Sequence, residues 1–195
     1  MTGCHRRHLI LLLGAVPLLG RAQAPAASPE ALRAALKAGG LTVFIRHAAT
    51  TWSGYDQLEW PRERQRLLTP QGEAQARQIG AAFTRLELPV GEVLASPFHR
   101  CLDTARIAFG RVTAEPRLLG LESDDRDAEA RRAYIQALAA EVAPGGKNRI
   151  VVSHQSNVAA ATGYRPGDGG AAITQAVGGK PQVLARLTPE AWATL

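Results

Sequence analysis

The chain has 195 residues, of which 46% are hydrophobic and 21% charged, and its formal net charge is +6. This composition is ordinary for one globular domain with a full core, and it excludes a disordered or low-complexity chain. The basic residues form no dense stripe interleaved with aromatic side chains, so a nucleic-acid partner is not expected. Of the two cysteines, Cys4 lies in the N-terminal segment considered next, and we expect a buried apolar role for Cys101.

Residues 1–24 have the features of a signal peptide. A basic start around Arg6 and Arg7 is followed by an apolar stretch from Leu9 to Leu19 and by an Ala22-Gln23-Ala24 cleavage motif. The apolar stretch is too short to span a bilayer as a helix. We therefore expect a periplasmic or secreted protein with no stable membrane insertion after removal of the leader. Residues 25–195 would remain as a single domain with 20 basic and 17 acidic residues.

Short apolar runs alternate with amphipathic helical segments through the rest of the chain. Strands are predicted at Leu41–Ile45, Glu92–Ala95, Val112–Ala114 and Arg149–Ser153, with weaker ones at Ala171–Val177 and Gln182–Leu187. Helices are predicted after Ser28-Pro29, after Thr69-Pro70, after Ser96-Pro97, at Ala128–Val142 and after Thr188-Pro189, with Gly-rich loops after His154. This alternation predicts a three-layer α/β/α sandwich around a mostly parallel central sheet.

The stretch from Thr51 to Arg66 is a long polar loop without a clear period. A loop of this length in a compact domain is usually functional, often as a lid. Its tryptophans, Trp52 and Trp60, could instead close the edge of the core, and the sequence leaves both readings open. The cluster Arg62–Arg66 is either a solvated part of this loop or a rim that attracts an anionic substrate.

Two of the apolar strands end in a histidine. Arg46-His47 follows the first strand, and His154 follows the strand Arg149–Ser153. Since parallel strands end at the same edge of a sheet, the two imidazoles face one crevice if these strands are neighbours. Ser96-Pro97 is expected to cap a helix that carries Arg100 in its first turn, near the same crevice. Two guanidinium groups, two imidazoles and a helix N-terminus predict a site for a phosphoryl dianion.

Four segments together resemble the histidine phosphatase superfamily, also called phosphoglycerate-mutase-like. These are Arg46-His47-Ala48-Ala49-Thr50, Leu68-Thr69-Pro70-Gln71-Gly72, Ser96-Pro97 with Arg100, and Ser153-His154. The resemblance implies the phosphoglycerate-mutase-like α/β/α fold and a covalent mechanism. His47 would be the nucleophile that forms phosphohistidine, and Arg46, Arg100 and His154 would hold the phosphate, with Thr50 as a further contributor to the pocket. No metal and no cofactor is implied, and no Cys-x-x-Cys or His-Glu-x-x-His supplies ligands beside the two histidines.

A leaving alkoxide needs a proton donor, which the family draws from the segment after the third helix. Glu122 is the best candidate there, with Asp124 and Asp125 behind it. A solvated turn accounts for these carboxylates equally well. Another branch of the family has an aspartate directly after the second histidine, where this chain has Gln155.

The sequence therefore predicts an exported, metal-independent phosphomonoesterase that acts through phosphohistidine on a small phosphorylated substrate. A sugar phosphate of the cell envelope is one candidate substrate, by analogy alone. Two alternatives stay open, a phosphate- or phosphoglycan-binding module with little turnover and a phosphomutase. The oligomeric state cannot be predicted from the sequence.

Overall fold

The structure is a computed structural model, and it describes residues 27–121 and 126–195. Its strands are β1 (Thr42–Arg46), β2 (Val90–Ala95), β3 (Thr113–Ala114), β4 (Asn148–Ser153), β5 (Ala171–Val177) and β6 (Lys180–Leu187). Its α-helices are α1 (Pro29–Ala38), α2 (Pro70–Arg85), α3 (His99–Phe109), α4 (Ala128–Ala140), α5 (Gln155–Thr162) and α6 (Ala191–Thr194). Short 3-10 turns lie at η1 (Arg62–Arg64), η2 (Pro116–Leu118) and η3 (Pro144–Gly146).

One six-stranded sheet with the order β3-β2-β4-β1-β5-β6 runs through the described part of the chain. The strands β3, β2, β4 and β1 are parallel, whereas β5 and β6 pair antiparallel at the other edge. The neighbours β1 and β4 are the two strands that end in histidine. The mostly parallel sheet and the pairing on which the crevice depends are both as predicted.

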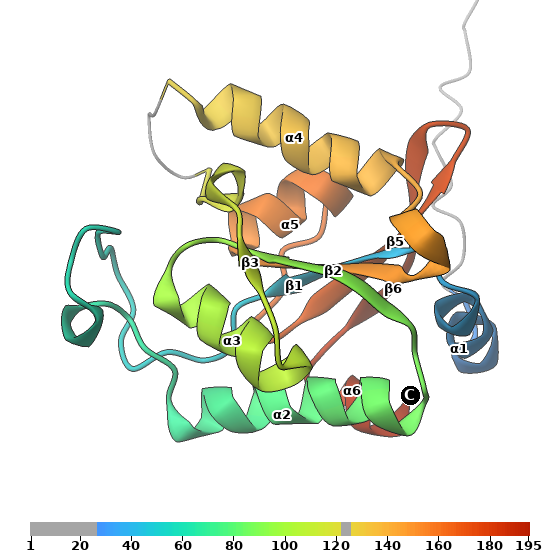
Figure 1. Ribbon diagram of the computed structural model, residues 1–195, viewed down its shortest axis with the longest axis horizontal. Helices are drawn as coiled ribbons and strands as arrows, with labels where there is room; N and C mark the ends of the chain where they lie inside the picture. The colour runs from blue at the N-terminus through green and yellow to red at the C-terminus, as the bar shows by residue number, and fades with distance from the viewer. Residues whose placement is uncertain (1–26, 122–125) are drawn as a thin grey trace, which may run out of the picture.

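Helices cover both faces of this sheet, because successive side chains of each central strand point to opposite sides. Val43 and Ile45 of β1 belong to the core cluster shared with α1, α2, α3 and α6, and Phe44 belongs to the cluster under α4 and α5. Figure 1 shows the sheet between α4 and α5 on one side and α2, α3 and α6 on the other. The predicted three-layer α/β/α sandwich is confirmed.

Two local predictions were wrong. Ser96 does not cap α3, because the helix begins at His99 with Phe98 as its N-cap and no side chain bonds the cap. The hydroxyl of Ser96 is instead in contact with the ring of His154. The helix α5, placed among Gly-rich loops by the sequence, has no marked apolar stripe from which its period could be read.

Two close contacts fix the ends of β1. At its start, the buried amide of Asn148 donates to the carbonyl of Leu36 (2.7 Å) and accepts from the backbone N–H of Leu41 (3.3 Å). Beyond its end, Gly72 of α2 lies against the backbone of Ala49, where a Cβ would come within 2.1 Å of the Ala49 carbonyl oxygen. The segment after His47 is therefore held tightly against the first turn of α2.

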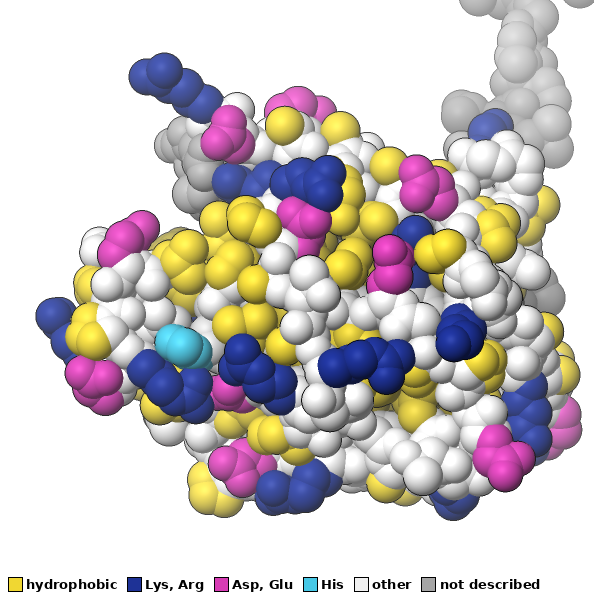
Figure 2. Space-filling view, viewed as in Figure 1, with side chains coloured by type: hydrophobic (Ala, Val, Ile, Leu, Met, Phe, Trp, Pro, Cys, Tyr) yellow, Lys and Arg dark blue, Asp and Glu magenta, His cyan; other side chains and the backbone are white. Residues whose placement is uncertain are grey.

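No helix in the ranges 27–121 and 126–195 is both long enough and apolar enough to cross a bilayer. Figure 2 shows basic and acidic side chains distributed together over the face that it presents.

Candidate active site

The register of β1 and β4 brings the two histidines together. Arg46 pairs with Ser153 across the two parallel strands, so His47 and His154 leave the sheet at the same level. Their ring centroids are 5.9 Å apart, and the two residues are only 3% and 7% exposed. The expectation that both imidazoles lie at one place on the sheet edge is confirmed in geometry.

His47 is held by its backbone and by its own ring. Its N–H donates to the carbonyl of Ser153 (2.9 Å), and its Nδ1 lies 2.9 Å from the carbonyl oxygen of Ala48. Because a carbonyl oxygen only accepts, Nδ1 carries the proton and the lone pair of the neutral ring is on Nε2. Burial and the charges of Arg100, Arg46 and Arg66 lower the pKa of His47 to about 3. This nitrogen is thus available as a nucleophile at neutral pH.

His154 is oriented by two partners. Its Nδ1 accepts from the guanidinium of Arg100 at 3.3 Å, and its Nε2 consequently donates to the hydroxyl of Ser96 at 2.8 Å. Burial and the neighbouring charge of Arg100 hold the pKa of His154 well below its usual range. The buried thiol of Cys101 lies 4.0 Å from the same Nε2, and burial raises the pKa of this thiol to about 12. Cys101 is therefore an inert core residue, as predicted, although it does have a histidine beside it.

The two predicted phosphate-binding arginines are already engaged by carboxylates. One amino group of Arg100 bonds both carboxylate oxygens of Asp56, at 2.8 and 2.9 Å. Arg46 pairs with Asp168 at 2.7 Å and donates to the carbonyl of Pro166 at 3.1 Å. The Nε atoms of both arginines are buried and bond no described residue. Each guanidinium thus retains a donor that an oxyanion can accept from.

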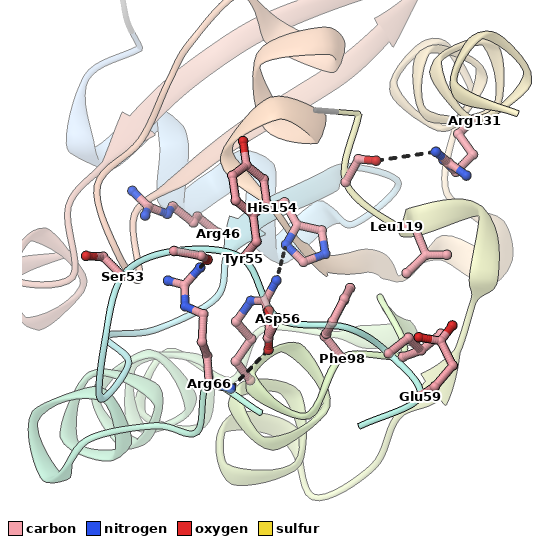
Figure 3. A pocket seen from close by; sticks show the side chains of 14 residues that line it. Arg46, Ser53, Tyr55, Asp56, Glu59, Arg66, Phe98, Leu119, Arg131 and His154 are labelled. Atoms are coloured by element: carbon pink, nitrogen blue, oxygen red, sulfur yellow. Dashed lines mark hydrogen bonds and ion pairs between the residues drawn. The ribbon is translucent and has the colours of Figure 1, made fainter. Parts of the chain in front are cut away.

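A cavity of about 580 Å³ opens beside these groups. It is lined by the residues Arg46, Ser53, Gly54, Tyr55, Asp56, Leu58, Glu59, Arg66, Phe98, Arg100, Leu119, Gly120, Arg131 and His154. Figure 3 shows Asp56 and His154 at its centre, with Arg46 and Arg131 on opposite sides of the view. His47 is not a lining residue; it is buried, and its ring lies next to that of His154, which lines the cavity.

The structure brings together four of the six predicted site residues, namely Arg46, His47, Arg100 and His154. Thr50 stands apart from them. Its hydroxyl accepts from Arg66 (2.9 Å) and donates to the carbonyl of Trp52 (3.1 Å), so it fastens the base of the loop. Glu122, together with Asp124 and Asp125, lies outside the described residues, and its role stays a prediction.

The loop 51–66 forms a wall of the cavity. Its tryptophans do not close the core, since Trp52 is 39% exposed and neither Trp52 nor Trp60 belongs to a core cluster. The arginines of the cluster Arg62–Arg66 have different positions. Arg66 lines the cavity, whereas Arg62 lies outside it and pairs with Asp103 at 2.7 Å. The first of the two readings of this loop, a functional segment, agrees with its position.

The sequence did not predict Asp56 as a site residue or Ser96 as a partner of His154. It also did not single out Arg66 as a residue that lines the cavity. The length of the loop and its basic cluster were the available signals, and they did not single out Asp56. Within residues 27–121 and 126–195, no group of three or more His, Cys, Asp or Glu residues is arranged to hold a metal ion.

A neutral imidazole among guanidinium groups, at the end of a central parallel sheet, is an arrangement suited to phosphoryl transfer. Residues 42–120 match the family model of the histidine phosphatase superfamily (branch 1). This matched segment includes Arg46, His47 and Arg100, and the match agrees with the resemblance seen in the sequence motifs. Branch 1 agrees with Gln155 in the position where another branch has an aspartate.

Solved structures show the same fold. The protein histidine phosphatase SixA complexed with tungstate is 20% identical, with a TM-score of 0.59 over 77% of this chain and 98% of that one. The Rv3214 protein of Mycobacterium tuberculosis is 24% identical, with a TM-score of 0.56 over 76% and 98%. A phosphoserine phosphatase mutant from Entamoeba histolytica in complex with phosphoserine is 14% identical, with a TM-score of 0.54 over 77% and 98%. No curated protein matches the sequence.

Proposed function

We propose that this protein is a phosphomonoesterase that works through a phosphohistidine at His47 and without a metal ion. The observation that carries the proposal is the state of His47, a neutral imidazole with its Nε2 lone pair available near the buried Arg100 and the partly buried Arg46. A purely structural role does not account for these arginines, because their positive charges oppose protonation of the imidazole and so do not stabilise a charged ring.

The residues support a two-step displacement. The guanidinium groups of Arg46 and Arg100 hold the phosphoryl oxygens and offset the charge that spreads over them in the transition state. The lone pair on Nε2 of His47 forms the P–N bond while the ester P–O bond breaks, and water then cleaves the P–N bond to release inorganic phosphate. Ser96 orients the ring of His154, and the Nδ1 of His154 accepts a hydrogen bond from Arg100. This contact helps to hold the guanidinium of Arg100 near His47.

A small phosphorylated substrate agrees with a cavity of about 580 Å³ whose wall mixes arginines with Tyr55, Leu58 and Phe98. Export to the periplasm or the cell exterior is part of the proposal and depends on the leader-like residues 1–24. There the substrate would be an extracytoplasmic phosphoester, with a sugar phosphate of the envelope as the first compound to test.

A single-turnover experiment tests the proposal. The wild type should release a burst of product from p-nitrophenyl phosphate and trap an acid-labile, alkali-stable phosphoryl label, and H47A should lose both. H99A is the matched control, since His99 is half-buried outside the cavity, and it should retain both signals. Saturable phosphate binding without any turnover would instead identify a binding module, and transfer of phosphate between hydroxyls would identify a mutase.

A further inference from the structure

The proposed reaction, on which this inference rests, requires a group that protonates the leaving oxygen of a substrate alcohol. Only two carboxylates line the cavity among the described residues, Asp56 and Glu59. Both come from the loop between β1 and α2, far in sequence from the segment that follows α3. Glu59 is exposed to solvent, whereas the side chain of Asp56 is 2% exposed.

Asp56 is built into the phosphate site. Both of its carboxylate oxygens lie within 2.9 Å of one amino group of Arg100, and Oδ2 also accepts from the backbone N–H of Arg66 at 3.0 Å. The other amino group of Arg100 contacts His154. Asp56 therefore shares one guanidinium with the second histidine of the site.

The position of His47 decides on which side the leaving group departs. His47 is buried next to His154, which lines the cavity, and in-line attack places the leaving oxygen opposite its Nε2. In the proposed reaction that oxygen points into the cavity, whose wall includes Asp56 (Figure 3). A phosphoryl dianion on Arg100 also brings a second anion next to this carboxylate. Two anions on one guanidinium repel each other, and proton uptake by the carboxylate relieves the repulsion.

We propose that Asp56 is the proton donor and proton acceptor of the reaction. When substrate binds, the carboxylate takes up one proton from the bulk solvent, supplied by hydronium or a buffer acid. As His47 Nε2 forms the P–N bond and the P–O bond breaks, the Asp56 O–H proton passes to the leaving oxygen and yields the alcohol. In the second step the Asp56 carboxylate removes a proton from water, whose oxygen attacks phosphorus while the P–N electron pair returns to Nε2.

Leaving groups of different basicity test this role. In D56N, turnover of glycerol 2-phosphate, whose alkoxide needs a proton, should fall by about 10²–10⁴. The burst rate with p-nitrophenyl phosphate, whose phenolate leaves unaided, should change less than tenfold, and the phosphoenzyme should accumulate because its hydrolysis lacks a base. E63Q changes an exposed acid of the same loop that is not a lining residue, and both reactions should be unchanged in it.

Several results would overturn the assignment. Equal losses with both substrates would show that Asp56 only positions Arg100, and an unchanged kcat with a lower KM would show that it only competes with phosphate. A leaving-group-dependent loss in E59Q or E122Q, with none in D56N, would transfer the role to that residue.

If D56N does not fold, D56E keeps a carboxyl group but displaces it. Turnover of the alkyl ester should then fall more than that of the nitrophenyl ester, and equal falls would again refute the role. A wild type that hydrolyses neither ester and forms no label on His47 would overturn the proposed function together with this inference. Activity in the wild type with any of the contrary results above overturns only the role of Asp56.

Discussion

Acid should unfold this protein largely through its two buried imidazoles. The pKa of His47 falls from the ordinary value near 6.5 to about 3 in the folded state, and that of His154 also lies well below 6.5. Below pH 6.5 the unfolded chain therefore binds more protons than the folded one. The stabilisation that the neutral rings provide is complete above pH 6.5 and is lost as the pH falls toward 3.

The size of this effect follows from linkage. Each pH unit below the unfolded pKa lowers the free energy of unfolding by about 1.4 kcal/mol for each ring that stays neutral in the folded state. With both rings neutral in the folded state down to pH 5, the slope is about 3 kcal/mol per pH unit and the loss between pH 8 and pH 5 is about 4 kcal/mol. That loss is a large part of the stability of a typical domain, which is about 5–15 kcal/mol.

Urea unfolding followed by tryptophan fluorescence at pH 8.0, 6.0, 5.5 and 5.0 measures the slope. H47N and H154N should each reduce it by about half, whatever their stability at pH 8. H99N is the control at an only partly buried histidine, and it should reduce the slope less than H47N or H154N does. Parallel slopes for wild type, H47N and H154N would refute the claim that these rings are held neutral in the folded protein.

Three further outcomes are expected. R100K should lower kcat/KM about 10²-fold or more in steady-state kinetics. The single ammonium group of lysine cannot replace the separate guanidinium nitrogens that contact Asp56 and His154 and also bind an oxyanion. A decrease of less than about fivefold would contradict this prediction. G72A should lower the free energy of unfolding by about 1–3 kcal/mol, because the new Cβ would clash with the Ala49 carbonyl oxygen. Urea unfolding measures this, and an unchanged urea midpoint would contradict the close packing. N148A should cost about 2–4 kcal/mol in the same assay, because two buried backbone groups, at Leu36 and Leu41, lose their partner.

Much of the fold could be predicted from local pattern. The strands β1 and β4 are short apolar runs with β-branched residues, and the starts of α1 and α2 combine a hydroxyl cap with proline at the first helical position. These signals act within a few residues of chain, so they can be read without knowing the neighbours. The small residues of α5 carry no such periodic signal, and its existence depends on packing against α4 and β5.

The main residues of the candidate active site could also be predicted, from a local pattern combined with a general rule for sheets. Two strands end in histidine, and parallel strands in one sheet end at the same edge, so the rule for sheets places His47 near His154 once the strands are neighbours. The sequence could not fix the register, but the structure pairs Arg46 with Ser153 and so aligns the two rings.

By itself, then, the sequence determined the α/β class, the family resemblance, and the identity of His47, His154, Arg46 and Arg100 as one group. Only the tertiary structure decided that Asp56 bonds Arg100 across 44 positions of chain and that Ser96 orients His154 instead of capping a helix. The physical reason is that a long polar loop has no periodic pattern to fix its path. Its course is set by ion pairs and hydrogen bonds to side chains on distant elements, and these exist only once the sheet has assembled.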